Sequence, residues 1–320
     1  MAGLYIHIPF CHSKCAYCDF YSRPSKNCSG EYRSFAYAAV REYEKRALEY
    51  LIANGKFGTA YIGGGTPSVM PLDIIGIILD KVVNDVETGG EITLECNPED
   101  VTASAIRGWL DSGVNRISMG IQSFEDNELI AVGRRHSAKD ALTAVDTLRS
   151  QGISNISLDL IYGLPEQTFE SWRHSVERLL ALRPEHFSAY ALSVEAGTRL
   201  YARMLAGRFT PMSDDEIVRM YDFLCIAARN AGYEHYEISN FALPGYRASH
   251  NSSYWRYEPY LGIGPSAVSF DGRNTRTTNS NDLTEYIHGR SIVREIEQES
   301  LVDRVNDVIL TALRTSDGLE

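Results

Sequence analysis

The chain alternates between short apolar runs, typical of strands, and longer amphipathic stretches, typical of helices. Six strands are expected, at Leu4–Ile8, Thr59–Ile62, Glu91–Cys96, Arg116–Ile121, Asn155–Tyr162 and His186–Leu192. The helices expected between them lie at Tyr32–Ala53, Pro71–Val86, Thr102–Ser112, Ala138–Gln151 and Phe169–Leu182. This succession of β/α units predicts an α/β fold with a parallel sheet that curls into a partial or full barrel.

The alternation stops after about Gly207. The later pattern predicts a helix at Asp214–Asn230, a strand at Glu234–Asn240 and a helix at Leu301–Leu313. An aromatic run, His250–Trp255, lies between them. We therefore expect residues 1–233 to form the barrel and residues 234–299 to extend its sheet or cover its mouth.

Unusual residues fall at or just past the ends of the expected strands. They are Gly63–Pro67 after the second strand, Glu95 at the end of the third, Gln122 and Arg134 after the fourth, and Asp159 within the fifth. Because the carboxyl ends of barrel strands form the active face, this distribution predicts a site there.

Each of these residues also has a plainer interpretation. The three glycines either form a tight turn or leave backbone bare for a ligand's amino group. On the plainer interpretation, Glu95 is an ordinary hydrogen-bonding acid. On the same interpretation, Gln122 and Arg134 are surface residues. Asp159 lies in an apolar run and needs partners, for which a ribose diol is suitable.

Three cysteines, Cys11, Cys15 and Cys18, follow the first expected strand in a C-x3-C-x2-C pattern. Three thiolates can hold three irons of a cubane iron–sulfur cluster, whose fourth iron then stays open for chemistry. Zinc is the competing interpretation, although its sites commonly use two pairs of ligands. A structural disulfide fits less well because three thiols cannot pair off.

Composition excludes several classes of protein. The 320 residues carry a net charge of −11, which argues against a general nucleic-acid binder. The other cysteines, at 28, 96 and 225, are scattered, so the thiols indicate a reducing, cytoplasmic compartment. No signal peptide is recognised, and the longest apolar run, Ile74–Leu79, is too short for a transmembrane segment.

His250 is a candidate haem ligand, since imidazole is a standard axial ligand of haem iron. Tyr254 and Trp255 follow it closely and offer flat apolar surfaces for a porphyrin. The alternative is that these aromatic residues belong to the core.

The cysteine motif is the signature of radical S-adenosylmethionine proteins. More closely, the runs Tyr5–Cys11, Gly63–Pro67, Gly120–Phe124 and Asp159–Pro165 resemble the oxygen-independent coproporphyrinogen dehydrogenase group, in order and over nearly the whole chain. The resemblance implies a partial (β/α)6 barrel with an accessory C-terminal region. It also implies that residues 300–320 begin a C-terminal helical domain that continues in full members of the group.

Two features resemble the haem-chaperone subtype of this group. The dehydrogenase has a fourth cysteine where this chain has Phe20, and His250-Asn251-x-x-Tyr254-Trp255 matches the subtype's haem-binding motif. The alternatives are the dehydrogenase itself, which decarboxylates coproporphyrinogen oxidatively in porphyrin biosynthesis, and a radical enzyme with an unrelated substrate.

The resemblance assigns roles to individual residues. Cys11, Cys15 and Cys18 would ligate a 4Fe–4S cluster. Tyr5 would lie beside S-adenosylmethionine, and Gly64, Gly65 and Thr66 would contact its amino-acid end. The pocket would be completed by Glu95, Gln122, Arg134 and Asp159. Whether one or two S-adenosylmethionine molecules bind stays open.

The resemblance also implies partners and a location. The protein would bind haem at His250 and deliver it to respiratory haem proteins, with an electron donor for the cluster. It would be cytoplasmic, and peripheral contact with the inner membrane is a further expectation. Cleavage of S-adenosylmethionine is compatible with this role, and its use in haem transfer stays open.

Overall fold

A sheet of parallel strands forms the centre of the computed structural model, which describes residues 1–24, 29–290 and 292–319. All six expected strands are confirmed, and each pairs in parallel with the next. They are β1 (Gly3–Ile8), β4 (Phe57–Gly64), β5 (Val86–Cys96), β6 (Arg116–Gln122), β7 (Ile156–Tyr162) and β8 (His186–Ala191). Two short strands, β2 (Phe10–Cys11) and β3 (Arg23–Pro24), pair separately beside the cysteine loop.

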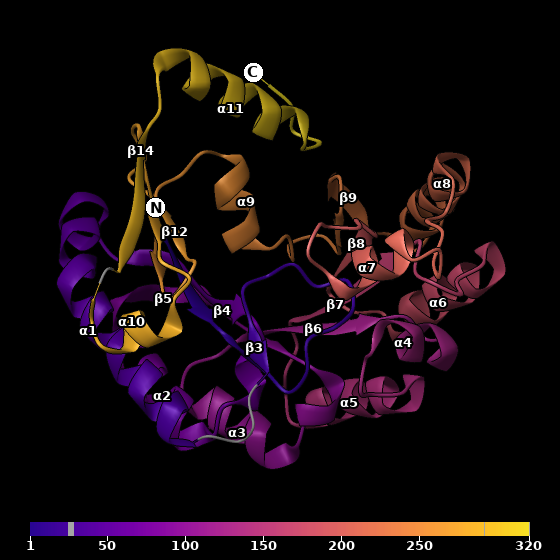
Figure 1. Ribbon diagram of the computed structural model, residues 1–320, viewed down its shortest axis with the longest axis horizontal. Coiled ribbons are helices and arrows are strands. Elements are labelled where there is room, and N and C mark those ends of the chain that lie inside the picture. The colour runs from indigo at the N-terminus through magenta and orange to yellow at the C-terminus, as the bar shows by residue number, and fades with distance from the viewer. Residues whose placement is uncertain (25–28, 291, 320) are drawn as a thin grey trace.

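Helices cover the convex outer face of this sheet (Figure 1). They are α1 (Ser29–Asn54), α2 (Leu72–Val82), α3 (Ala103–Asp111), α4 (Asp126–Val132), α5 (Ala138–Ser150) and α6 (Phe169–Leu182). Capping boxes at Ser137 and Thr168 satisfy free backbone N–H groups at the starts of α5 and α6. The five expected helices are confirmed. The sequence did not predict α4, because its two turns are too few to show a helical period.

Further strands extend this sheet at both edges, so that within the described ranges it has twelve strands. On β8 lies an antiparallel hairpin of β9 (Glu234–Glu237) and β10 (Asn240–Ala242). On β1 follow β11 (Tyr260–Ile263), β12 (Val268–Phe270), β13 (Thr275–Asn279) and β14 (Val293–Gln298). The single strand expected at 234–240 was wrong because the chain reverses after Glu237. Among the described residues the two outer strands do not pair with each other, so the barrel is partial.

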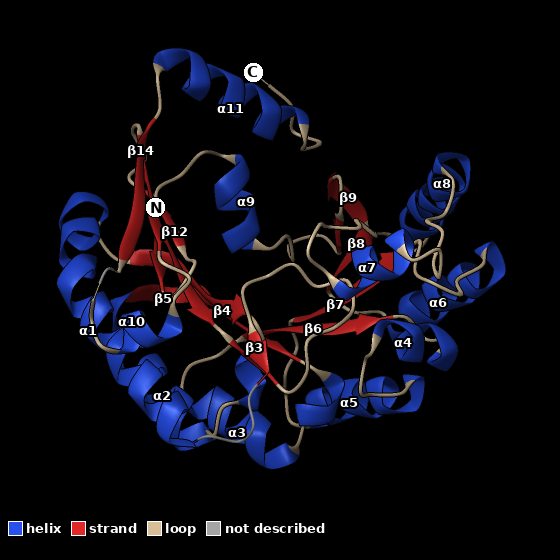
Figure 2. Cartoon of the chain, in the orientation of Figure 1, coloured by secondary structure: helices blue, strands red, loops and turns tan. Residues whose placement is uncertain are grey.

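The remaining helices are α7 (Arg199–Leu205), α8 (Asp214–Asn230), α9 (Ser249–Trp255), α10 (Leu283–Ile287) and α11 (Leu301–Leu313). The helices expected at 214–230 and 301–313 are confirmed. In Figure 2, α9 lies on the concave side of the sheet and α11 lies beyond it. The Arg314 guanidinium, which follows α11, sits 4.5 Å from the ring centre of Trp255 on α9. Of the helices in the described ranges, none combines the length and apolar character needed to span a bilayer.

The strands separate apolar from polar residues by their alternation. In β6, Ile117, Met119 and Ile121 belong to the hydrophobic core. The intervening residues, Arg116, Ser118, Gly120 and Gln122, line a cavity inside the barrel. The sheet therefore presents an apolar outer face to the helices and a polar inner face to the barrel interior.

Candidate functional site

A cavity of about 430 Å³ occupies the concave side of the sheet. Its wall contains ten of the residues that the sequence assigns to a site. These are Cys11, Cys15, Cys18, Gly64, Gly65, Thr66, Glu95, Gln122, Arg134 and Asp159. The fold thus gathers residues from the cysteine loop, four strands and the loop after α4. Tyr5 and His250 do not line it.

The three cysteines line this cavity, and polar donors are directed at two of their sulfurs. The Thr66 hydroxyl lies 3.4 Å from Cys11 Sγ, and Arg134 Nη1 lies 3.7 Å from Cys15 Sγ. Burial raises the pKa of the Cys18 thiol to about 11. Soft sulfur ligands beside a cation and a hydroxyl donor suit an iron–sulfur cluster, whose negative charge such groups stabilise. The residues present therefore fit the cluster.

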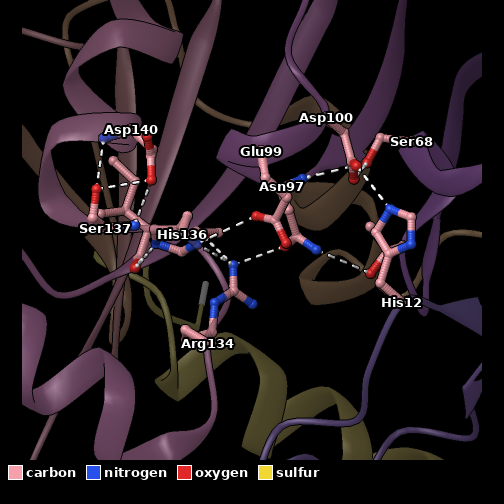
Figure 3. A network of polar contacts seen from close by, with 12 residues as sticks. His12, Ser68, Asn97, Glu99, Asp100, Arg134, His136, Ser137 and Asp140 are labelled. Atoms are coloured by element: carbon pink, nitrogen blue, oxygen red, sulfur yellow. Dashed lines mark hydrogen bonds and ion pairs between the residues drawn. The ribbon is translucent and has the colours of Figure 1, made fainter.

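A chain of polar contacts links the cysteine loop to the ends of β5 and β6 (Figure 3). His12 Nε2 lies 3.0 Å from Asp100 Oδ1, and the Ser68 hydroxyl donates to the other Asp100 oxygen. Arg134 donates to Asn97 Oδ1 at 2.7 Å. Because Arg134 also reaches Cys15, these contacts connect the loop to the sheet beneath it.

The glycine turn after β4 is required by the protein's own packing. A Cβ added at Gly64, whose φ is +102°, would lie 2.5 Å from His7 Nδ1. One added at Gly65 would lie 2.5 Å from the Phe10 carbonyl oxygen. Packing within the chain is therefore sufficient to require glycine at these two positions, and their contact with a ligand stays a prediction. Both still line the cavity.

Glu95 is held at the end of β5 by two donors. The Tyr61 hydroxyl donates to Oε1 at 2.7 Å, and the Gly64 N–H donates to Oε2 at 3.1 Å. Burial raises the pKa of the Glu95 carboxyl to about 7, and the nearby Asp159 adds to this. Each carboxylate oxygen keeps a lone pair for a further donor, such as an ammonium group.

Asp159 and Arg134 each have a buried atom without a hydrogen-bond partner in the described structure, Oδ1 and Nε respectively. Burial raises the pKa of the Asp159 carboxyl, although hydrogen bonds from Ser188 and Ser118 oppose this. Unsatisfied buried polar atoms are rare in folded proteins. Those facing a cavity fit a polar ligand such as S-adenosylmethionine.

Gln122 occupies an unusual backbone position at the end of β6. Its φ is +71°, and the pairing of β6 with β7 shifts register between Gly120 and Gln122. Such bulges redirect a side chain, and left-handed backbone at a non-glycine residue often marks a functional site.

Tyr5 and His250 pack together beside the cavity. The His250 ring stacks on Tyr61 with centroids 5.1 Å apart, and Tyr5 stacks on Tyr61 at 6.2 Å. His250 is 1% exposed, and both of its ring nitrogens are hydrogen-bonded: Nδ1 to Thr59 Oγ1 at 2.8 Å and Nε2 to the Tyr254 hydroxyl at 2.9 Å. His250 is therefore buried, whereas Tyr254 and Trp255 are half-buried and belong to no hydrophobic core cluster of the described residues, so the alternative interpretation holds for His250 alone. A haem iron would reach Nε2 only after the Tyr254 bond had broken.

Sequence reasoning missed several residues of the cavity wall, among them Tyr61, Asn97, Arg116 and Ser188. For the strand residues the missed signal was alternation. Arg116 shares the alternate positions of β6 with Gln122, which was recognised. Ser188 on β8 lies opposite Asp159 on β7, which was also recognised. Asn251 belongs to the motif that the resemblance assigns to haem binding, but because it lies on a helix no strand alternation indicates that it lines the cavity.

A protein-family model described as the radical SAM superfamily matches residues 5–179. The coproporphyrinogen III oxidase HemN of Escherichia coli has a similar fold, with a TM-score of 0.83 and 21% identity, covering 98% of this chain and 75% of that one. Fold and family model together define a radical S-adenosylmethionine protein. This class implies a 4Fe–4S cluster and S-adenosylmethionine as cofactors.

Curated relatives define the family more narrowly. The heme chaperone HemW of Lactococcus lactis is 34% identical, over 98% of this chain and 82% of its own length. The heme chaperone HemW of Bacillus subtilis is 36% identical, over 90% of this chain and 75% of its own length. A mouse mitochondrial relative, radical S-adenosyl methionine domain-containing protein 1, is 36% identical over 99% of this chain and 74% of its own. The chain belongs to the HemW family of the radical SAM superfamily.

Proposed function

We propose that this protein is a haem chaperone, which binds haem and delivers it to respiratory haem proteins. The observation that carries the proposal is the 34–36% identity with proteins named heme chaperone HemW over most of the chain. The proposed location is the cytoplasm, with peripheral contact at the inner membrane. Haem, its client proteins and an electron donor are the proposed partners.

In this proposal each part of the cavity has a separate task. Cys11, Cys15 and Cys18 hold the cluster, and Arg134 stabilises its negative charge from beside Cys15. With S-adenosylmethionine bound, the cluster supplies one-electron chemistry at the sulfonium centre. Glu95 and Asp159 accept hydrogen bonds from the cofactor's ammonium group or ribose hydroxyls. Tyr5 supports the wall from behind through its stacking on Tyr61.

Haem binding is tested by an absorption titration of anaerobically purified protein. We expect added haem at micromolar concentration to give a shifted Soret band that saturates with one class of site. A Soret band identical to that of free haem throughout the titration would overturn the proposed function.

Coproporphyrinogen should not be decarboxylated. Phe20 stands where the resembling dehydrogenase has its fourth cysteine, and its side chain is 69% exposed beside the cavity. Anaerobic incubation with coproporphyrinogen, S-adenosylmethionine and a reductant should yield no protoporphyrinogen above the level of a protein-free control. Product formed over several turnovers would favour the dehydrogenase instead.

Binding of S-adenosylmethionine should depend on Glu95 and on pH. The Glu95 carboxyl has a pKa of about 7, so it is mostly neutral below that pH and mostly ionised above it. An ionised carboxylate attracts the cofactor's ammonium group, so affinity should rise about tenfold from about pH 6 to about pH 8. Calorimetry on the wild type, Glu95→Gln and Asp159→Asn measures this.

The two variants separate charge from general damage to the pocket. Glu95→Gln should bind about tenfold more weakly at high pH and lose the pH dependence. Asp159→Asn should bind more weakly while keeping a rise with pH. A slope that persists unchanged in Glu95→Gln would mean that another group sets it.

A further inference from the structure

Arg116 is a buried cation with few partners. It opens β6, at the opposite end of that strand from Gln122, and is 2% exposed. Its nearest polar contacts are long: Thr93 Oγ1 lies 3.4 Å from Nη1, and Glu91 Oε2 lies 3.9 Å from Nε. Nε has no hydrogen-bond partner among the described residues. A guanidinium carries five N–H donors, so most of its hydrogen-bonding capacity is unused although it lines the cavity.

Asn251 lines the same cavity, from helix α9. The Glu91 carboxylate accepts hydrogen bonds from the backbone N–H groups of Ser249 and His250, both at 3.0 Å. Glu91 thus holds the start of α9 close to Arg116. The following residue, Asn251, lines the cavity, and its side chain forms no hydrogen bond within the described structure. In the aromatic motif, therefore, Asn251 faces the cavity and His250 faces the core.

We propose that Arg116 and Asn251 form a carboxylate-binding site in this cavity. A guanidinium binds a carboxylate through two parallel N–H donors, and the Asn251 amide supplies a further donor. The proposal rests on the proposed function for its ligand: a propionate of haem is the carboxylate expected there. The carboxylate of S-adenosylmethionine is the other source of the same chemistry.

The simpler alternative is that Arg116 only compensates buried negative charge. Glu91, Glu95 and Asp159 all lie near enough to interact with it. That role would make Arg116 important for stability without any preference for a ligand carboxylate. A carboxylate-binding role predicts that a substitution weakens the binding of ligands with a free carboxylate more than that of ligands without one. A purely structural role predicts equal losses of affinity for both.

The test compares haem with haem dimethyl ester, in which both propionates are blocked. Asn251→Asp keeps the size of the side chain and adds a negative charge in the first turn of α9, where acids are tolerated. Ser252→Asp is the matched control, because it adds the same charge one position along the same helix to a residue that does not line the cavity. Arg116→Met removes the cation. If the Arg116→Met variant fails to fold, Asn251→Asp alone provides the test.

We expect the wild type to bind haem about tenfold more tightly than the ester. Asn251→Asp should lower the affinity for haem to that for the ester and leave the affinity for the ester unchanged. Ser252→Asp should alter neither affinity. Equal losses for haem and ester would overturn the site and favour a structural role. No effect of Asn251→Asp on any ligand would also overturn it.

Calorimetry with S-adenosylmethionine distinguishes the two sources of the carboxylate. A loss for this cofactor alone would keep the site and make the amino-acid carboxylate its occupant. If the wild type binds no haem, the proposed function fails, but the cofactor titration still decides whether Arg116 and Asn251 hold a carboxylate.

Discussion

Replacing Cys11, Cys15 and Cys18 together by alanine should abolish iron binding and leave the fold in place. The three thiols line one cavity, and we expect them to ligate the 4Fe–4S cluster that the radical SAM superfamily implies. Anaerobic reconstitution of the wild type should give about four irons per chain, and the triple variant should retain almost none. The loss of packing is small because Cys15 and Cys18 are only half-buried.

Circular dichroism and a denaturant midpoint would verify that the triple variant is folded. Cys225→Ala is the matched control, since Cys225 is a half-buried free thiol away from the cavity. Cys96 lines the cavity and is the substitute ligand to examine, whereas Cys28 lies outside the described residues. A triple variant that keeps a cluster, and loses it only when Cys96 is also replaced, would contradict the assignment.

His250→Ala should lower the free energy of unfolding by about 2–4 kcal/mol. The substitution removes a ring that stacks on Tyr61 and leaves the Thr59 and Tyr254 hydroxyls without their shared partner. Burial, with the charge of Arg116, lowers the pKa of His250 to about 3, so the ring is neutral over the whole working range. In the unfolded chain the imidazole has its ordinary pKa near 6.5, so it takes up a proton at about pH 6 that the folded state cannot bind, and the wild type loses stability there while the variant does not. The loss measured by chemical denaturation should therefore be larger at about pH 8 than at about pH 6, by a little under about 1 kcal/mol.

Tyr254→Phe separates the two roles of His250. It removes the hydroxyl that bonds Nε2 but keeps the ring, and it should cost only about 1 kcal/mol. If His250 is the axial ligand of haem, freeing Nε2 should preserve or strengthen haem binding, while His250→Ala should move the Soret maximum. A Soret band identical in the wild type and a folded His250→Ala variant would leave His250 as a residue that only positions α9.

Most of the barrel could be predicted from the sequence because its elements are defined locally. A strand such as β6 shows its period within seven residues, and helices such as α6 carry both an apolar stripe and a capping residue. The short helices α4, α7 and α9 have seven residues each, so their periodicity was not visible. The reversal between β9 and β10 was missed for the same reason, since each strand has four residues or fewer.

The sequence by itself determined the α/β architecture and most of the cavity wall. Parallel strands place their carboxyl ends on one face, so residues as far apart as Cys11 and Asp159 could be assigned to one site from strand order alone. The family resemblance, carried by short motifs in order, likewise needed no coordinates.

Only the tertiary structure decided which way individual side chains point inside the barrel. His250 is buried through contacts with Thr59 and Glu91, more than 150 residues away in the chain. Asn251, its neighbour, lines the cavity, as Arg116 does from β6. The sequence His250-Asn251 does not indicate which of the two side chains faces the cavity. The choice is made by the carboxylate of Glu91, which orients α9, and by the aromatic rings that fill the space around His250.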